Sequence, residues 1–303
     1  MKYRGAVLFA LVMPVAACSG AGPEDEALRR GDEAFARGDL AEALAEYRLS
    51  LAQGAGDVDT LLRVAHAYAE SSRIDEAREY YLAAAERDPG TADLGASDLL
   101  RAARRAMARQ DGTLAAAAVE GAVLLKPGVS LQGISLPLAR HFARNGRHGQ
   151  ALPFFQKAIR EMETDPEVVF EMALAHAELG DCRRALVFLE QIRGAVGPAR
   201  RPEVDWNIGN CSADLAIEAR AEENGEEALR LHRVTIGIGE PRNRLARAWF
   251  EVGEILESQG ECRAAVEAYD QVGRQDLSRG FIVAEAERRV DEIRFRRGGE
   301  GPC

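Results

Sequence analysis

The chain repeats one short phrase, which first reads Gly38-Asp39-Leu40-Ala41-Glu42-Ala43 and joins a turn to a closing alanine. Its other copies are Ser72–Ala77 (SRIDEA), Gly146–Ala151 (GRHGQA), Gly180–Ala185 (GDCRRA) and Gly260–Ala265 (GECRAA). The closing alanines are separated by 34 residues from Ala43 to Ala77, and again from Ala151 to Ala185. A period of this length indicates a row of helix–turn–helix units.

The residues around each turn have matching sizes. A small residue stands seven positions before the turn, at Gly31, Ala65, Ala139, Ala173 and Gly253. A large apolar residue stands four positions after the closing alanine, at Tyr47, Tyr81, Phe155, Leu189 and Tyr269. We expect the small residues to let the two helices of a unit approach closely, and the large ones to fill the space toward the next unit. Turn glycines suit a left-handed C-cap, and Asp39 and Asp181 are suited to cap the helix that follows.

This set of positions resembles the tetratricopeptide repeat family. The resemblance implies an all-α fold, an α-solenoid of antiparallel helix pairs that winds into a right-handed superhelix with about six to seven repeats and a C-terminal capping helix. We expect units at 27–56, 57–90, 93–128, 131–164, 165–198, 203–240 and 242–275, and the capping helix at 279–297. The third unit is degenerate and the sixth is the poorest match, with one long first helix expected over Trp206 to Glu223. Another α-solenoid of irregular period is the alternative.

The first residues have the character of an export signal. Lys2 and Arg4 precede an uncharged run from Gly5 to Ala17, which is shorter than the roughly 20 residues that a membrane-spanning helix needs. The run ends in Val15-Ala16-Ala17-Cys18, which resembles a bacterial lipoprotein signal and implies lipidation at Cys18. An ordinary secretory signal with an incidental cysteine is the alternative. Because no aspartate follows Cys18, the resemblance implies an outer-membrane lipoprotein facing the periplasm.

These observations divide the chain into four expected segments. They are a signal peptide at 1–17, a flexible tether at 18–26, the repeat solenoid at 27–297 and a glycine-rich tail at 298–303.

Composition excludes some classes of protein. The 303 residues are 47% hydrophobic and 29% charged, which is typical of folded chains. The formal net charge of −10 argues against a nucleic-acid partner, because neutralising phosphates needs a basic face. The sequence lacks the common catalytic motifs, and its five histidines are scattered, so we expect no enzyme activity, no cofactor and no metal site.

The four cysteines after Cys18 allow three disulfide pairings in an oxidising compartment. Cys182 opens the second helix of its unit, and Cys211 lies in the antiparallel helix that returns beside it, so we favour Cys182–Cys211. Cys262–Cys303 then follows by elimination, with the tail folding back. Free thiols are the alternative reading.

The family resemblance implies a concave groove that is lined by the first helix of each unit. Candidate peptide-binding positions are His66, Glu70, Arg104, Arg140 and Arg144. We interpret the three arginines as a basic patch for an acidic peptide or a chain terminus, since a guanidinium binds carboxylates in a bidentate manner. Solvated surface arginines are the alternative. Asp32 stands where the family's C-terminal clamp needs asparagine, which argues against that role.

The hypothesis that follows is a non-enzymatic, lipid-anchored scaffold that binds another protein or peptide of the cell envelope. Its only membrane contact would be through the N-terminal lipid. The alternatives are a self-assembling structural lipoprotein, or a component of a pilus, polysaccharide or β-barrel assembly system. The residues do not distinguish among these systems.

Overall fold

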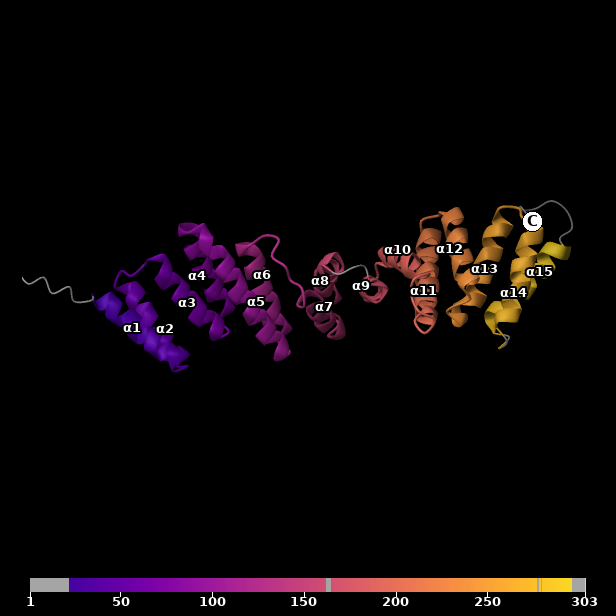
Figure 1. Ribbon diagram of the computed structural model, residues 1–303. Coiled ribbons are helices and arrows are strands. Elements are labelled where there is room, and N and C mark those ends of the chain that lie inside the picture. The colour runs from indigo at the N-terminus through magenta and orange to yellow at the C-terminus, as the bar shows by residue number, and fades with distance from the viewer. Residues whose placement is uncertain (1–21, 162–164, 277, 279, 296–302) are drawn as a thin grey trace, which may run out of the picture. The chain divides into compact units, whose positions relative to one another are not determined.

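The computed structural model describes residues 22–161, 165–276, 278, 280–295 and 303. Within these residues it contains fifteen α-helices, one short 3-10 helix and no strand (Figure 1). The expected all-α fold of consecutive helix pairs is therefore confirmed. The helices are α1 (Pro23–Ala36), α2 (Leu40–Ala52), α3 (Val58–Glu70), α4 (Ile74–Arg87), η1 (Pro89–Thr91), α5 (Ala92–Ala108), α6 (Gly112–Leu125), α7 (Ser135–Arg144), α8 (His148–Glu161), α9 (Pro166–Glu178), α10 (Cys182–Ile192), α11 (Arg201–Ala221), α12 (Gly225–Ile238), α13 (Arg242–Ser258), α14 (Cys262–Gln275) and α15 (Phe281–Phe295).

The chain forms two compact units. The first comprises the described residues up to Ala103 together with 117–129, and the second comprises 104–116 and the described residues from Ser130 onward. In the first unit α1 pairs with α2 and α3 with α4. In the second unit the pairs are α7 with α8, α9 with α10, α11 with α12 and α13 with α14, and α15 packs on α14 as a final single helix.

The turns within the pairs have the backbone geometry that the repeated phrase predicts. Gly38 and Gly180 have φ angles of 80° and 76°, and Ser72 occupies the same position with φ 64°. The carboxylate of Asp39 accepts a hydrogen bond from the Glu42 amide at 3.0 Å, and Asp181 accepts one from the Arg184 amide at 3.2 Å. Each phrase therefore ends one helix and caps the next.

The small residues allow close packing within a pair. A Cβ atom added to Gly31 in α1 would lie 2.5 Å from the ring of Tyr47 in α2. At the corresponding positions of later pairs, Ala65, Ala139 and Ala173 are fully buried. A larger side chain at these positions would separate the two helices of the pair.

The sixth pair differs from the others, as its poor match predicts. Its first helix, α11, is 21 residues long, and a Cβ on Gly209 would lie 1.7 Å from the carbonyl oxygen of Glu240. The hydroxyl of Thr235 also donates to the Gly209 carbonyl oxygen at 3.1 Å. Gly209 is thus the point at which α11 lies directly against the turn between α12 and α13.

The structure describes the chain from residue 22, one residue before α1 begins. Helix α1 begins at Pro23, inside the range 18–26 that was expected to be a tether. Proline suits the first position of a helix, and Glu24, Asp25 and Glu26 suit its positively polarised N-terminus. The predicted signal peptide and Cys18 lie outside the described residues, as does the tail except for Cys303.

Candidate functional site

In both units the first helices of consecutive pairs are joined by ion pairs. Carboxylate and guanidinium groups meet in the three pairs Asp32–Arg63 between α1 and α3, Arg140–Glu171 between α7 and α9, and Asp214–Arg244 between α11 and α13. The partners are separated by 30 or 31 residues, close to one repeat. Charged residues on the face that was expected to be a groove therefore also connect one repeat to the next.

Arg140, one of the predicted groove residues, forms a bidentate contact with Glu171. Its Nε and Nη2 atoms donate to the two carboxylate oxygens of Glu171, with the shortest distances at 2.8 Å and 2.7 Å. This hydrogen bonding raises the pKa of Arg140, against the opposing effect of burial. The guanidinium that was assigned to an acidic peptide thus already binds a carboxylate of the neighbouring repeat.

The other two arginines of the predicted basic patch are exposed. Arg144 lies on α7 at the edge of a hollow of about 370 Å³ between α7, α8 and α9. Arg104 lies on the exposed side of α5. Of the three arginines in the predicted patch, Arg140 is therefore paired with Glu171, and the binding of an acidic peptide there stays a prediction.

His66 and Glu70 lie in the first unit near a buried carboxylate. The Nδ1 atom of His66 is 2.8 Å from Oδ2 of Asp98, and the Tyr81 hydroxyl donates to the same oxygen at 2.7 Å. Burial acts to raise the pKa of Asp98, but the hydrogen bonds from His66 and Tyr81 hold that pKa below its usual value. Glu70 is half-buried, and its charge contributes to the raised pKa of Tyr81, which is due first to burial.

A larger hollow, of about 610 Å³, lies between α11 and α13. Its lining residues are Ala213, Ile217, Arg220, Ala221, His232, Arg244, Arg247, Ala248, Glu251 and Glu254. The alanines and Ile217 make its surface mainly apolar, and Ile217 is 59% exposed. We refer to this site as the α11–α13 hollow.

The charges at the α11–α13 hollow are paired, Arg244 with Asp214 outside the lining and the other four with one another. Arg220 lies 3.3 Å from Glu254 and 3.7 Å from Glu251, and Arg247 also pairs with Glu251. Burial raises the pKa of Glu254 and lowers the pKa of His232. His232 is buried, and its Nδ1 atom has no hydrogen-bond partner among the described residues. The site therefore combines an apolar floor with a compensated polar rim.

Sequence reasoning did not identify the α11–α13 hollow, because the sixth unit fits the repeat pattern least well. A signal was present in the spacing of Trp206, Ala213 and Ile217, at positions i, i+7 and i+11, which places them on one stripe of α11. Two of these three residues, Trp206 and Ile217, are exposed in the structure.

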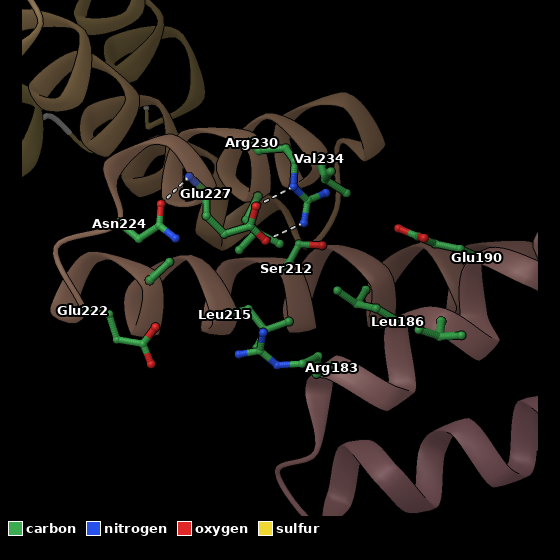
Figure 2. A pocket seen from close by; sticks show the side chains of 13 residues that line it. Arg183, Leu186, Glu190, Ser212, Leu215, Glu222, Asn224, Glu227, Arg230 and Val234 are labelled. Carbon is green, nitrogen blue, oxygen red and sulfur yellow. Dashed lines mark hydrogen bonds and ion pairs between the residues drawn. The ribbon is translucent and has the colours of Figure 1, made fainter.

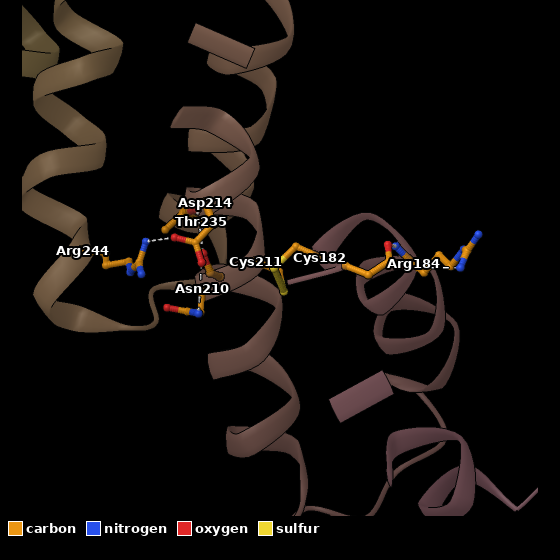
Figure 3. Close-up of a disulfide and its surroundings, with 9 residues drawn as sticks. Cys182, Arg184, Asn210, Cys211, Asp214, Thr235 and Arg244 are labelled. Carbon is orange, nitrogen blue, oxygen red and sulfur yellow. Dashed lines mark hydrogen bonds and ion pairs between the residues drawn. A yellow bond between two sulfur atoms is a disulfide. The ribbon is translucent and has the colours of Figure 1, made fainter. Parts of the chain in front are cut away.

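The cysteines are paired as expected. Cys182 at the start of α10 is bonded to Cys211 in α11, with their Cα atoms 5.0 Å apart (Figure 3). Cys262 at the start of α14 is bonded to Cys303, with a Cα–Cα distance of 5.4 Å. The first bond attaches the atypical sixth pair to the fifth.

No group of three or more histidine, cysteine or acidic side chains in the described part of the chain is arranged to hold a metal ion. No described helix combines the length and the apolar character that crossing a membrane requires.

Comparison with known families identifies the repeat. Residues 58–91, which are α3, α4 and η1, match the family model of the tetratricopeptide repeat. This segment is similar to a single tetratricopeptide repeat. Repeats of this family are protein-interaction scaffolds that bind proteins or peptides.

Two curated relatives carry the same name. The chain is 30% identical over 252 residues to the cellulose synthase operon protein C of Xanthomonas axonopodis pv. citri (strain 306), and 26% identical over 223 residues to that of Pseudomonas fluorescens (strain SBW25). These matches cover 80% and 70% of this chain, but only 15% and 17% of the relatives. The chain thus spans about a sixth of their length.

Among solved structures, the chain is similar to YrrB, described as a tetratricopeptide-repeat protein with an unusual peptide-binding site. The identity is 17%, the coverage is 69% of this chain and 97% of YrrB, and the TM-score is 0.34. It is also similar to the C-terminal part of a tetratricopeptide repeat-containing protein from Cytophaga hutchinsonii. That match has 18% identity, covers 86% of this chain and 98% of the other, and has a TM-score of 0.36.

Proposed function

We propose that this protein is a lipid-anchored scaffold of the bacterial cell envelope that binds another envelope protein or peptide and acts by binding, without catalysis. Its binding surface is the face formed by the first helices of consecutive repeats. The tetratricopeptide repeat at 58–91 supports the general role, because repeats of this family bind proteins and peptides.

The α11–α13 hollow is the observation that carries the proposal. It offers about 610 Å³ of mainly apolar space, and the exposed side chain of Ile217 has no apolar covering there. Sites that bind ligand groups are commonly hollows of this size with an apolar lining and a few polar groups. Because Arg220, Arg247 and the two glutamates already neutralise one another, we expect the partner to contribute an apolar side chain.

The anchoring part of the proposal rests on the sequence. Val15-Ala16-Ala17 precede Cys18, and Ser19 follows it, in the pattern of a lipoprotein destined for the outer membrane. Lipid chains at Cys18 would hold the scaffold at the membrane, since stable attachment needs two anchoring signals such as two acyl chains.

A role in polysaccharide secretion is the second candidate. The name of both relatives, cellulose synthase operon protein C, favours this system over pilus or β-barrel assembly. Trp206, 46% exposed on the same stripe of α11 as Ile217, provides an aromatic surface that a carbohydrate chain could stack against. In this role the scaffold would hold a secretion component or the polymer itself.

In-cell crosslinking with the full chain as bait tests both candidates. Ile217→Glu places a charge in the α11–α13 hollow. Leu124→Glu is its matched control, because Leu124 is similarly exposed, at 60%, but lies on α6, the second helix of its pair and outside the proposed binding face. We expect capture of one envelope protein that Ile217→Glu abolishes and Leu124→Glu preserves. Cys18→Ser should move the chain out of the membrane fraction and weaken capture.

Other outcomes would count against the proposal. Capture of only further copies of this chain would favour the self-assembling structural protein. Equal capture by both glutamate variants would exclude the α11–α13 hollow as the contact surface. An unchanged membrane fraction for Cys18→Ser would exclude the lipid anchor while leaving the scaffold role standing.

A further inference from the structure

A second hollow lies on the side of the second unit that is formed by the second helices of the pairs. It has a volume of about 250 Å³ and lies between α10 and α12, with α11 beneath (Figure 2). We refer to it as the α10–α12 hollow. Its polar lining residues are Arg183, Glu190, Ser212, Glu222, Asn224, Glu227 and Arg230, and its apolar ones include Leu186, Leu215 and Leu231.

Ser212 indicates that this hollow accepts a polar ligand. The residue is fully buried, and its hydroxyl oxygen has no hydrogen-bond partner among the described residues. An unsatisfied buried hydroxyl costs about 1–3 kcal/mol. In Figure 2 Ser212 lies on the side of α11 that faces Arg230 and Glu227 of α12. A hydroxyl group of a ligand in the hollow would supply the missing partner.

Four of the five charged groups of the α10–α12 hollow balance one another, and the fifth, Glu222, is exposed to solvent. Glu227 accepts two hydrogen bonds from Arg230, both of 2.7 Å, and its amide donates to the Asn224 side chain at 3.2 Å. The charge of Arg183 also acts on Glu227, and that of Glu190 acts on Arg230. Guanidinium and carboxylate groups therefore alternate around the hollow.

This alternation favours a neutral ligand. An anion would be attracted by the arginines and repelled by the glutamates. A cation would be attracted by the glutamates and repelled by the arginines. A molecule with many hydroxyl groups can instead donate to carboxylates and accept from guanidiniums without breaking the Glu227–Arg230 pair. Leu186, Leu215 and Leu231 offer an apolar floor to its C–H groups.

We propose that the α10–α12 hollow binds one or two units of a neutral sugar. Its volume lies below the roughly 300–1,000 Å³ of drug-sized sites, which limits the occupant to this size. The disulfide between Cys182 and Cys211 fixes the two walls that carry the neighbouring Arg183 and Ser212. The inference is independent of the scaffold function, because it rests on a different face of the repeats.

Titration of the full chain, purified in detergent with its disulfides intact, tests the inference. Cellobiose and glucose are the neutral probes, glucuronate and glucosamine are the charged ones, and amide chemical shifts in NMR spectra give site and affinity. We expect millimolar binding of cellobiose with shifts at Ser212 and Leu215. Arg183→Ala and Glu190→Gln change exposed residues of the rim, and each should weaken binding about tenfold, as the loss of one charge-assisted hydrogen bond implies.

Matched controls are Arg184→Ala and Glu218→Gln, which change exposed neighbours outside the hollow and should leave affinity unchanged. Ser212→Ala, which removes only the unpartnered hydroxyl, should weaken sugar binding without lowering the thermal midpoint. No shift with either neutral sugar would overturn the inference, as would a crystal soaked in cellobiose that holds only ordered water on Ser212. Tighter binding of glucuronate or glucosamine than of cellobiose would overturn it in favour of a charged ligand.

Discussion

The ring of Tyr269 occupies the space that a side chain at Gly253 would need. A Cβ atom on Gly253 in α13 would lie 2.6 Å from Cε1 of Tyr269 in α14. Gly253 is the small residue seven positions before the turn, and Tyr269 is the large residue four positions after the closing alanine. Tyr269 is almost fully buried. The absence of a side chain at position 253 therefore allows the last helix pair to close.

Gly253→Ala should destabilise the second unit. The added methyl group must displace the buried ring, and such overpacking typically costs about 1–3 kcal/mol. The matched control is Gly237→Ala, also in a helix, where nothing lies within 4 Å of the added Cβ. For Gly237→Ala we expect the free energy of unfolding to stay the same or to rise slightly, since alanine favours helix more than glycine does. Urea unfolding followed by circular dichroism measures both, and equal stability of the two variants would contradict the packing argument.

The buried carboxylate of Asp98 should make the first unit sensitive to acid. Hydrogen bonds from His66 and Tyr81 hold the pKa of Asp98 below its unfolded value of about 3.9. The ionised carboxylate therefore stabilises the fold at pH values above the unfolded pKa. This contribution is lost as the pH falls through the lower pKa of the folded state.

Asp98→Asn should lower the free energy of unfolding at neutral pH by about 1–3 kcal/mol, because it removes a charged acceptor. Its difference from the unmodified chain should shrink below about pH 4. The control Asp75→Asn changes an exposed carboxylate that pairs with Arg78 and should have little effect. A pH-independent difference in thermal unfolding for Asp98→Asn would contradict the role of its charge.

The disulfide between Cys182 and Cys211 should stabilise the attachment of the sixth pair to the fifth. The cysteines are 29 residues apart in sequence, and closing such a loop contributes about 3–4 kcal/mol in the chain-entropy model. The double variant Cys182→Ser/Cys211→Ser should lose that amount under oxidising conditions. With reductant present, it should match the reduced unmodified chain. Mass mapping that finds four free thiols in the exported protein would contradict both bonds.

The ion pair between Arg140 and Glu171 should contribute little to stability, although its geometry is bidentate. The Arg140 side chain is 43% exposed, and exposed pairs typically contribute about 0.2–1 kcal/mol. A double-mutant cycle with Arg140→Ala and Glu171→Ala measures this coupling. The swapped variant Arg140→Glu/Glu171→Arg should recover part of the loss. A coupling of zero would indicate that Arg140 is available to a partner after all.

The sequence alone determined the repeat period, the helix pairs and the turns of this protein. Gly38 and Asp39 act locally, through backbone geometry and a hydrogen bond three residues away, so their roles follow from the order of residues. The pairing of Cys182 with Cys211 was also accessible, because antiparallel helices of known length bring defined positions together.

Only the tertiary structure decided what the surface side chains contact. Periodicity placed His66 and Arg140 on one face of their helices, but their partners Asp98 and Glu171 lie about one repeat further along the chain. Such contacts depend on how the repeats stack and on the rotamers of long side chains, which no spacing rule contains. For the same reason the α11–α13 hollow and the unpartnered hydroxyl of Ser212 emerged only from the packed helices, where three separate segments enclose one space.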